Sequence, residues 1–265
     1  MNYISYAQKF EDLIIWNALR DVKNGFYVDI GANDPIKFSV TKNFYEKGWN
    51  GINIEPLPTC YNELVNDRTR DININCAVSN QSGMIEYYET FPDNMFSTFD
   101  KSIIPEYIKQ GMAFTTRTVQ VNTLNQILDL YKNKFTEIHF LKIDVEGFEE
   151  QVIQGFDLCK YRPWIIIIEV SISKDFTYLN KVVSSDYVLA FSDDQNYYYL
   201  AKEHIDLLTR FNEDITSKYS IYIVRDMNAY RQEISNIHNS YINSISWKIT
   251  KPLRLMRKII KNIRI

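Results

Sequence analysis

Carboxylate side chains accompany four apolar segments of the sequence. Asp29 lies within the first segment, Glu55 follows the second, Asp144 and Glu146 follow the third, and Glu169 ends the fourth. A carboxylate beside a buried strand loses hydration, which is costly unless the group binds a ligand or takes part in catalysis. Carboxylates placed in this way can accept hydrogen bonds from hydroxyl groups, take a proton from a substrate, or hold a divalent cation.

A turn with a single glycine follows the first segment, where Gly31 precedes Ala32, Asn33 and Asp34. Glycine allows the backbone to turn tightly and to approach a ligand. A pyrophosphate site normally uses three glycines in the pattern GxGxxG. This turn has one glycine, and the carboxylates of Asp29 and Asp34 would repel phosphates. The turn therefore favours a ligand with an amino group and a sulfonium, S-adenosylmethionine, although the two acids could instead cap the turn.

The second acid, Glu55, has the position of a ribose ligand. Roughly twenty residues separate it from Gly31, as in a nucleoside-binding βαβ unit. Ala77 and Val78, after the next strand, are small and apolar and suit the sides of an adenine ring. The alternative for Glu55 and Pro56 is an ordinary turn at a strand end.

The third and fourth segments place Asp144, Glu146 and Glu169 along one edge of the predicted sheet. These carboxylates could accept a substrate proton, orient a hydroxyl or hold a divalent cation, although no clear motif supports a metal site. Helix capping is the alternative for Glu146. His139 lies at the start of its strand, away from this edge, and we expect it to be structural.

The segments that position these residues alternate between strand and helix patterns. Strands are predicted at residues 26–30, 51–54, 71–78, 138–143, 165–170, 187–191 and 220–224. Helices are predicted at 7–22, 39–47, 59–66, 124–132, 176–183 and 203–211, and after Gly147. This alternation predicts an α/β fold with a seven-stranded, mostly parallel, Rossmann-like sheet and helices on both faces. A plain dinucleotide fold is the competing arrangement.

The middle of the chain is less regular. Residues 83–90 indicate a hairpin and residues 117–122 an alternating strand, with an unassigned stretch at 94–98 between them. A long irregular insertion in an α/β domain is typical of a loop that faces the substrate.

Composition and charge restrict the class of protein. The chain has 265 residues, of which 45% are hydrophobic and 24% charged, as in soluble globular proteins. Three cysteines without paired spacing and an N-terminus without a secretory signal pattern favour a cytoplasmic location. The net charge of −3 divides into +7 over residues 245–265 and −10 over the rest, because the tail holds 7 of the 30 basic residues and no acid. An acidic body argues against nucleic-acid binding.

The basic tail has the pattern of an amphipathic helix that begins near residue 251. Apolar side chains fall on one stripe and basic ones opposite, as in helices that lie on an anionic membrane surface. We expect residues 245–265 to bind peripherally to the inner face of the cell membrane or to a partner protein. Packing of this helix on its own domain or on a second subunit is the alternative. The predicted domains are residues 1–230, with an N-terminal helical cap over 1–24, and a tail over 231–265.

Five segments, in order, resemble the FkbM family of S-adenosylmethionine-dependent methyltransferases. They are SYAQKFED (5–12), VDIGAND (28–34), FYEKGWNGINIEP (44–56), CAVSN (76–80) and KIDVEGFE (142–149). The resemblance implies a class I methyltransferase fold and transfer of a methyl group to a hydroxyl oxygen, typically on a sugar or a polyketide-type product. Residues 244–254 also resemble a tail found on bacterial surface-polysaccharide glycosyltransferases and their partner enzymes, which implies that residues 245–265 dock on glycan-assembly enzymes.

The resemblance also implies roles for individual residues. It places Asp29, Gly31, Ala32 and Asn33 at the methionine end of the cofactor, Glu55 at the ribose, and Ala77 and Val78 beside the adenine. It places Asp144 and Glu146 at the reacting end, with Gln8 closing the pocket. The acceptor hydroxyl loses its proton in this reaction, and Asp144 or Glu169 is our candidate for the base. One departure is Asn125, where the family often has an acid.

The leading hypothesis is therefore an O-methyltransferase that acts on a sugar hydroxyl of a bacterial surface polysaccharide. One alternative is a non-catalytic nucleoside-binding module that scaffolds a glycan-assembly complex. Another is an NAD-dependent oxidoreductase, which the lone glycine and Asp34 disfavour.

Overall fold

A computed structural model describes residues 2–91, 94–170, 186–193 and 195–224. The chain divides into two compact units, Met1–Ile223 and Val224–Ile265, and the description below concerns the first. The helix predicted at 176–183 and the basic tail at 245–265 lie outside the described residues. Within them, no helix is long and apolar enough to cross a bilayer.

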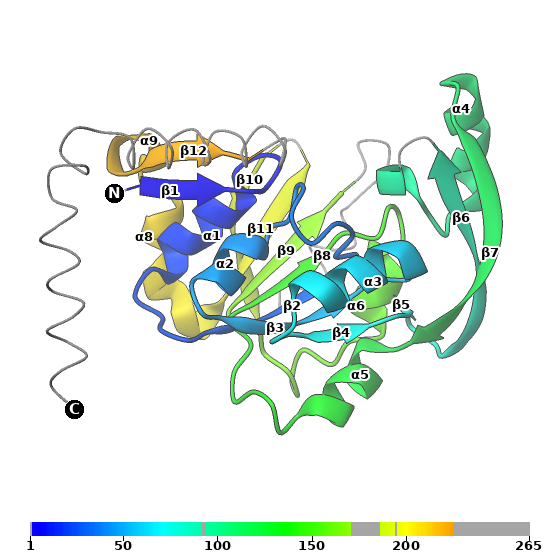
Figure 1. Ribbon diagram of the computed structural model, residues 1–265. Helices are drawn as coiled ribbons and strands as arrows, with labels where there is room; N and C mark the ends of the chain where they lie inside the picture. The colour runs from blue at the N-terminus through cyan, green and yellow to red at the C-terminus, as the bar shows by residue number, and fades with distance from the viewer. Residues whose placement is uncertain (1, 92–93, 171–185, 194, 225–265) are drawn as a thin grey trace, which may run out of the picture. The chain divides into compact units, whose positions relative to one another are not determined.

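The core of the first unit is a sheet to which the described residues contribute seven strands (Figure 1). Its order is β10-β11-β9-β8-β2-β3-β4. The strands are β2 (Phe26–Ile30), β3 (Asn50–Ile54), β4 (Ile72–Ile74), β8 (Phe140–Ile143), β9 (Ile165–Glu169), β10 (Tyr187–Ser192) and β11 (Asn196–Ala201). Neighbours from β4 to β9 pair in parallel, whereas β11 runs antiparallel to both β9 and β10. This mixed α/β sheet is consistent with a methyltransferase-like fold.

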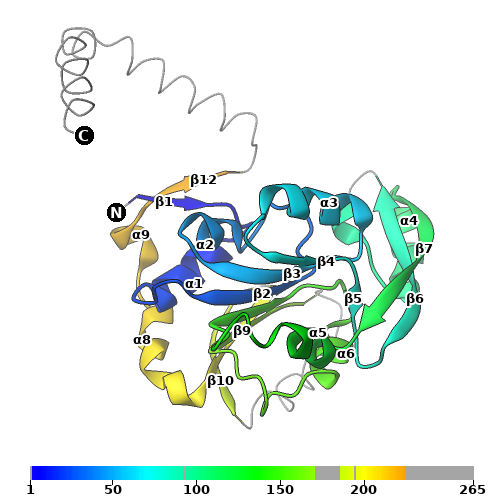
Figure 2. The same ribbon diagram turned by 60° about the horizontal axis from the view of Figure 1, so that its bottom comes forward.

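Helices cover both faces of this sheet, because successive side chains of each buried strand point to opposite faces. On one face, Val28 belongs to a cluster with side chains of α5 (Leu124–Tyr131) and α6 (Glu149–Gln154). On the other face, Tyr27 belongs to a cluster with side chains of α1 (Glu11–Leu19), α2 (Lys42–Glu46) and α8 (Leu208–Phe211). Figure 2 shows α5 and α6 on the opposite side of β2 and β3 from α2.

The remaining helices are short or lie at the edges. They are α3 (Pro58–Asp67), α4 (Ile104–Lys109) and α9 (Ile215–Lys218), with 3-10 turns η1 (Asn94–Phe96), η2 (Lys101–Ile103) and η3 (Lys202–Leu207). The predicted helix at 124–132 is confirmed by α5, whose N-terminus has a Thr123 and Gln126 capping box. The helix predicted from residue 7 begins only at Glu11, because Phe10 adopts a left-handed conformation with φ 67°. The N-terminal cap is therefore a short strand followed by a helix.

The prediction that residues 220–224 form the seventh strand of the sheet is wrong. Those residues form β12 (Ser220–Ile223), which pairs in parallel with β1 (Asn2–Ser5) in a separate two-stranded sheet. The strand that fills the place beside β9 is β11. This internal position requires side chains that can be buried, and Tyr198 and Leu200 of β11 are buried, whereas Tyr222 of β12 is 53% exposed.

The strand predicted at 71–78 is divided in two. After β4, the chain leaves the large sheet, and β5 (Ala77–Val78) pairs with β7 (Ala113–Asn122). The hairpin predicted within 83–90 is also wrong, because this segment is one nine-residue strand, β6 (Gly83–Phe91), paired antiparallel with β7. Residues 83–122, which include η1, η2 and α4, are called the arm below. The arm lies to the right in Figure 1, beyond β4 and β5.

Candidate functional site

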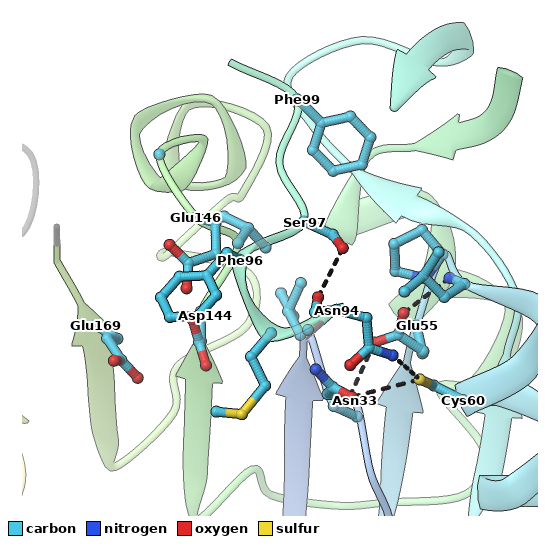
Figure 3. A pocket seen from close by; sticks show the side chains of 18 of the residues that line it. Asn33, Glu55, Cys60, Asn94, Phe96, Ser97, Phe99, Asp144, Glu146 and Glu169 are labelled. Carbon is cyan, nitrogen blue, oxygen red and sulfur yellow. Dashed lines mark hydrogen bonds between the residues drawn. The ribbon is translucent and has the colours of Figure 1, made fainter. Parts of the chain in front are cut away.

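A pocket of about 1120 Å³ lies at the carboxyl ends of β2, β3, β8 and β9 (Figure 3). The order of these strands in the sheet places Glu169, Asp144, Gly31 and Glu55 in that sequence along one edge. Because adjacent strands lie about 4.8 Å apart, Glu55 and Asp144 are separated by about two strand spacings. The pocket exceeds the usual volume for one drug-sized ligand, so it has room for a cofactor and part of a second molecule.

The pocket brings together nearly all of the residues singled out in the sequence. Its lining includes Gln8, Gly31, Ala32, Asn33, Glu55, Pro56, Ala77, Val78, Asp144, Glu146 and Glu169. Asp29 is the exception, since it is 1% exposed and lies beneath the lining. Its Oδ2 accepts a hydrogen bond of 2.9 Å from the hydroxyl of Thr41. Asp29 therefore affects the pocket indirectly, through its contacts with Thr41 and Lys142.

Gly31 brings the turn after β2 into contact with the turn after β8. Its φ is +77°, and a Cβ atom there would lie 1.8 Å from the carbonyl oxygen of Asp144. The amides of Gly31 and Ala32 both donate to the carbonyl of Ile54, which closes the turn against β3. A side chain at position 31 is therefore excluded both by the positive φ of the backbone and by the contact with the carbonyl oxygen of Asp144.

Glu55 connects this turn to the start of α3. Its two carboxylate oxygens accept hydrogen bonds of 2.8 Å from the backbone amides of Asn33 and Leu57. Burial raises the pKa of Glu55 to about 7, even though these hydrogen bonds act in the opposite direction. The carboxyl group is thus held rigidly in the wall of the pocket, where further hydroxyl donors could reach it.

Lys142 is a central residue of the site that the sequence interpretation missed. Its Nζ lies 2.9 Å from Oδ2 of Asp144 and 3.6 Å from Oδ1 of Asp29, and donates to the carbonyl of Gly31 at 3.4 Å. Burial lowers the pKa of Lys142, but the charges of Asp144, Asp29 and Glu169 outweigh it, and the pKa is raised. The alternation of side chains along β8 is the signal that could have revealed it, since Lys142 and Asp144 are two residues apart.

The pKa values of the other two acids of this cluster, Glu169 and Glu146, are raised. The negative charge of Asp144, followed by burial, raises the pKa of Glu169. Burial, followed by the charge of Asp144, raises the pKa of Glu146. Of Asp144, Glu146 and Glu169, Asp144 forms an ion pair with the Lys142 ammonium. Among the described residues, no group of three His, Cys, Asp or Glu side chains is arranged to hold a metal ion.

The N-terminal segment closes another side of the pocket. Gln8 lies at the rim, and Glu11, which the sequence interpretation did not single out, also lines the pocket. The carboxylate of Glu11 accepts a hydrogen bond of 2.7 Å from the amide of Lys9. Burial raises the pKa of Glu11 as well. Glu11 therefore adds a fifth carboxyl group to the surroundings of Lys142.

The arm supplies the wall that faces the sheet edge. The stretch at 94–98, unassigned in the sequence, contains η1, and Asn94, Phe96 and Ser97 line the pocket. The side-chain amide of Asn94 donates to the sulfur of Cys60 at 3.2 Å, and the thiol of Cys60 donates to the side-chain oxygen of Asn33 at 3.3 Å. Figure 3 shows this chain of contacts on the Glu55 side of the pocket.

Two residues noted in the sequence have structural roles. The Nδ1 atom of His139 accepts a hydrogen bond from the amide of Phe26, and its ring packs against Trp164, as expected of a structural residue. Asn125, the departure from the family pattern, accepts a hydrogen bond from the amide of Asp157 and does not line the pocket. Neither side chain takes part in the site.

Comparison with protein families supports one assignment. The model of the methyltransferase FkbM domain matches residues 29–225, well over half of the chain. The matched region begins within β2 and contains Gly31, Glu55, Asp144, Glu146 and Glu169, whereas Gln8 and Glu11 precede it. A search of curated proteins gives no match to the chain. The chain belongs to the FkbM methyltransferase family.

Proposed function

We propose that the protein is an S-adenosylmethionine-dependent O-methyltransferase of the class I fold that methylates a sugar hydroxyl. Its proposed setting is the biosynthesis of a bacterial surface polysaccharide. The observation that carries the proposal is the order of Glu55, the Gly31 turn and the Lys142–Asp144 pair along one sheet edge, in a chain of this family.

The donor groups of the pocket fit S-adenosylmethionine. Glu55 offers a fixed carboxylate for ribose hydroxyls, and the buried side chains of Ala77 and Val78 offer an apolar place for a base. Acids outnumber bases around Lys142, which favours a ligand with a sulfonium and an ammonium group over one with a pyrophosphate. These features support the methyl donor over NAD.

The reaction requires little covalent chemistry from the protein. Bound S-adenosylmethionine supplies a methyl group that is already activated for transfer. The pocket walls orient the acceptor hydroxyl and exclude water. Asp144 accepts the hydroxyl proton, while the ammonium of Lys142, 2.9 Å away, holds its carboxylate in place. Glu169 is the second candidate for the base.

The proposal is tested by incubating the protein with methyl-labelled S-adenosylmethionine and a panel of saccharides, followed by mass spectrometry of the saccharides. We expect a labelled methyl group on a hydroxyl oxygen. Asp144→Asn should reduce turnover by about 10²–10⁴-fold, as for loss of a general base, and still bind the cofactor. Glu150→Gln makes the same chemical change on α6, outside the pocket, and should leave turnover unchanged. Near-normal turnover of Asp144→Asn would remove Asp144 from this role.

We propose that the tail, residues 245–265, binds peripherally to the cytoplasmic face of the membrane or to a glycan-assembly partner. Its support is the charge of +7 over residues 245–265 against the acidic remainder. The test is sedimentation with anionic liposomes. The full chain should sediment and a chain without residues 245–265 should not. Equal binding by both would contradict the membrane role.

A further inference from the structure

The arm places two aromatic rings in the pocket that the proposed chemistry does not yet use. Phe96 of η1 and Tyr107 of α4 both line the pocket. Their ring centroids lie 5.8 Å apart with the planes inclined by 66°. Phe96 is 39% exposed, so a large apolar surface is open to the pocket and to solvent.

The hydrophobic core of the arm is formed by other rings. Tyr87 and Phe99 are buried, with centroids 4.4 Å apart, and Phe99 also packs against Phe148. Phe96 and Tyr107 are not members of that cluster. The arm is therefore packed without them, and their position at the pocket calls for another explanation.

The loop that carries Phe96 is fixed at both of its ends. At one end, the side-chain amide of Asn94 donates to the sulfur of Cys60. At the other, the hydroxyl of the fully buried Thr98 donates to the carbonyl of Glu146 at 2.6 Å. Between them, the hydroxyl of Ser97 donates to the carbonyl of Asn94 at 2.6 Å. These bonds fix the loop that carries Phe96 before any ligand arrives, which lowers the entropic cost of binding.

The position of the ring identifies which part of the pocket it serves. In the view of Figure 3, Phe96 lies on the Asp144 and Glu146 side, across the pocket from Glu55 and Cys60. The hydrogen bond from Thr98 to Glu146 ties the loop to this same side. The rings therefore border the end where the proton is accepted, away from the place proposed for the ribose.

The surroundings of the two rings indicate the chemistry of their ligand. Polar side chains of the same region of the arm, Ser102, Glu106 and Gln110, also line the pocket. A hydrocarbon chain would match a wholly apolar wall. A pyranose ring instead combines an apolar face of C–H groups with hydroxyls at its edge, and it needs both an aromatic surface and hydrogen-bonding groups.

We propose that Phe96 and Tyr107 form the acceptor subsite, which binds a pyranose ring by its C–H face and directs one of its hydroxyls toward Asp144. This inference rests on the proposed function and adds to it the residues that select the acceptor. Because Phe96 is partly exposed to solvent, the subsite can take one sugar unit of a larger glycan as well as a free monosaccharide.

The test is saturation-transfer NMR on the protein saturated with S-adenosylhomocysteine. The probes are the methyl pyranosides of glucose, galactose, mannose, rhamnose and fucose, with the open-chain polyol glucitol for comparison. We expect transfer to the ring C–H protons of at least one pyranoside and none to glucitol. Phe96→Leu and Tyr107→Ala should weaken binding of that pyranoside about tenfold, near the upper range for an aromatic contact. Phe114→Ala, which removes an exposed ring of the arm outside the pocket, should leave binding of that pyranoside unchanged.

Phe96→Leu keeps apolar volume in the loop while removing the aromatic face, so a folded variant is expected. If both variants bind the pyranoside as the wild type does, or if no pyranoside receives saturation, the subsite proposal is wrong. The proposed function is judged separately, by calorimetric titration of the wild type with S-adenosylhomocysteine alone. If S-adenosylhomocysteine binds but neither Phe96→Leu nor Tyr107→Ala weakens pyranoside binding, the subsite is refuted and the methyltransferase proposal remains.

Discussion

Lys142 separates the acids of the pocket into two kinds. It contacts Asp144 and Asp29 directly, whereas Glu146 and Glu169 have raised pKa values and hold protons more readily. Among the several carboxyl groups that line the pocket, Lys142 therefore holds that of Asp144 at a defined place. In the proposed reaction, Lys142 is a positioning residue that acts through Asp144.

Replacement of Lys142 should separate turnover from stability. Lys142→Met removes the cation that holds the Asp144 carboxylate in place, so kcat should fall while S-adenosylhomocysteine still binds. Lys142→Arg keeps the charge and should restore much of the wild-type turnover. If Lys142 only stabilised the fold, the methionine variant would melt at a lower temperature but would retain wild-type kcat below that temperature.

The raised pKa values of Glu146 and Glu169 predict proton release on cofactor binding. A sulfonium beside these groups favours their charged forms, lowers their pKa and expels protons, so affinity for S-adenosylmethionine should increase as the pH rises from neutral. Calorimetry at pH 8 in phosphate and in Tris separates the protonation heat from the binding heat. S-adenosylhomocysteine, whose sulfur is uncharged, is the control and should release fewer protons. Equal release by the two ligands would contradict this electrostatic picture.

At the scale of elements, the turns after β2 and β8 form one structural unit. Gly31 allows them to touch, since its missing side chain leaves room for the carbonyl of Asp144. The hydrogen bond from Thr98 to Glu146 adds the arm to this unit. The site is therefore assembled from three segments far apart in the sequence, each fixed by a backbone contact.

Gly31→Ala should be strongly destabilising, and Gly48→Ala provides a matched control. Both glycines have positive φ, at +77° and +91°, but a Cβ at Gly48 would meet nothing within 4 Å. Gly48→Ala should cost only the conformational penalty of about 1–2 kcal/mol in the free energy of unfolding. Gly31→Ala should cost more and should also impair cofactor binding, because the two turns must separate. Urea unfolding of both variants measures the difference, and equal losses would show that the contact with Asp144 is unimportant.

At the scale of the whole molecule, several buried acids make stability depend on pH. Burial raises the pKa of Asp12 and of Glu55 to about 7, above the ordinary values of 3.8 and 4.5. Each group binds a proton more tightly when folded, so its stabilising effect is complete below the ordinary value and is lost as the pH rises toward 7. The free energy of unfolding should therefore fall between pH 5 and pH 7.5.

Asp12→Asn removes one of these titrations while keeping a polar group in the same place. The hydroxyl of Ser5 and the amide of Tyr6 donate to Asp12, which joins β1 to α1. The variant should show a shallower fall in the free energy of unfolding over this pH range in urea titrations. An unchanged slope would mean that Asp12 does not titrate there.

The parallel strands and most of the pocket could be predicted from the sequence. The pattern of residues 26–30 predicts the strand that forms β2, because a strand buried on both faces is a nearly continuous apolar run, interrupted here by Asp29. The acids that follow such runs come together because parallel strands share their carboxyl edge.

The rest depended on pairings between distant segments. The sequence pattern predicts residues 220–224, and not the Tyr-rich β11, as the last strand of the large sheet. The structure has β11 in that sheet, because a local pattern does not show which strand pairs at an internal position. The pairing of β6 with β7 spans the whole arm, so nothing within residues 83–90 reveals its partner. The sequence places Phe96 in an insertion that is expected to face the substrate, but only the folded arm shows that Phe96 and Tyr107 reach the pocket together.

The central claim is that this sheet edge binds a sulfonium nucleoside, and calorimetric titration of the full chain tests it most directly. S-adenosylmethionine and S-adenosylhomocysteine should both bind at one site per chain, and Ala32→Leu, which adds bulk to the pocket lining, should weaken both. NAD should give no binding heat. Binding of NAD with no response to S-adenosylmethionine would contradict the account.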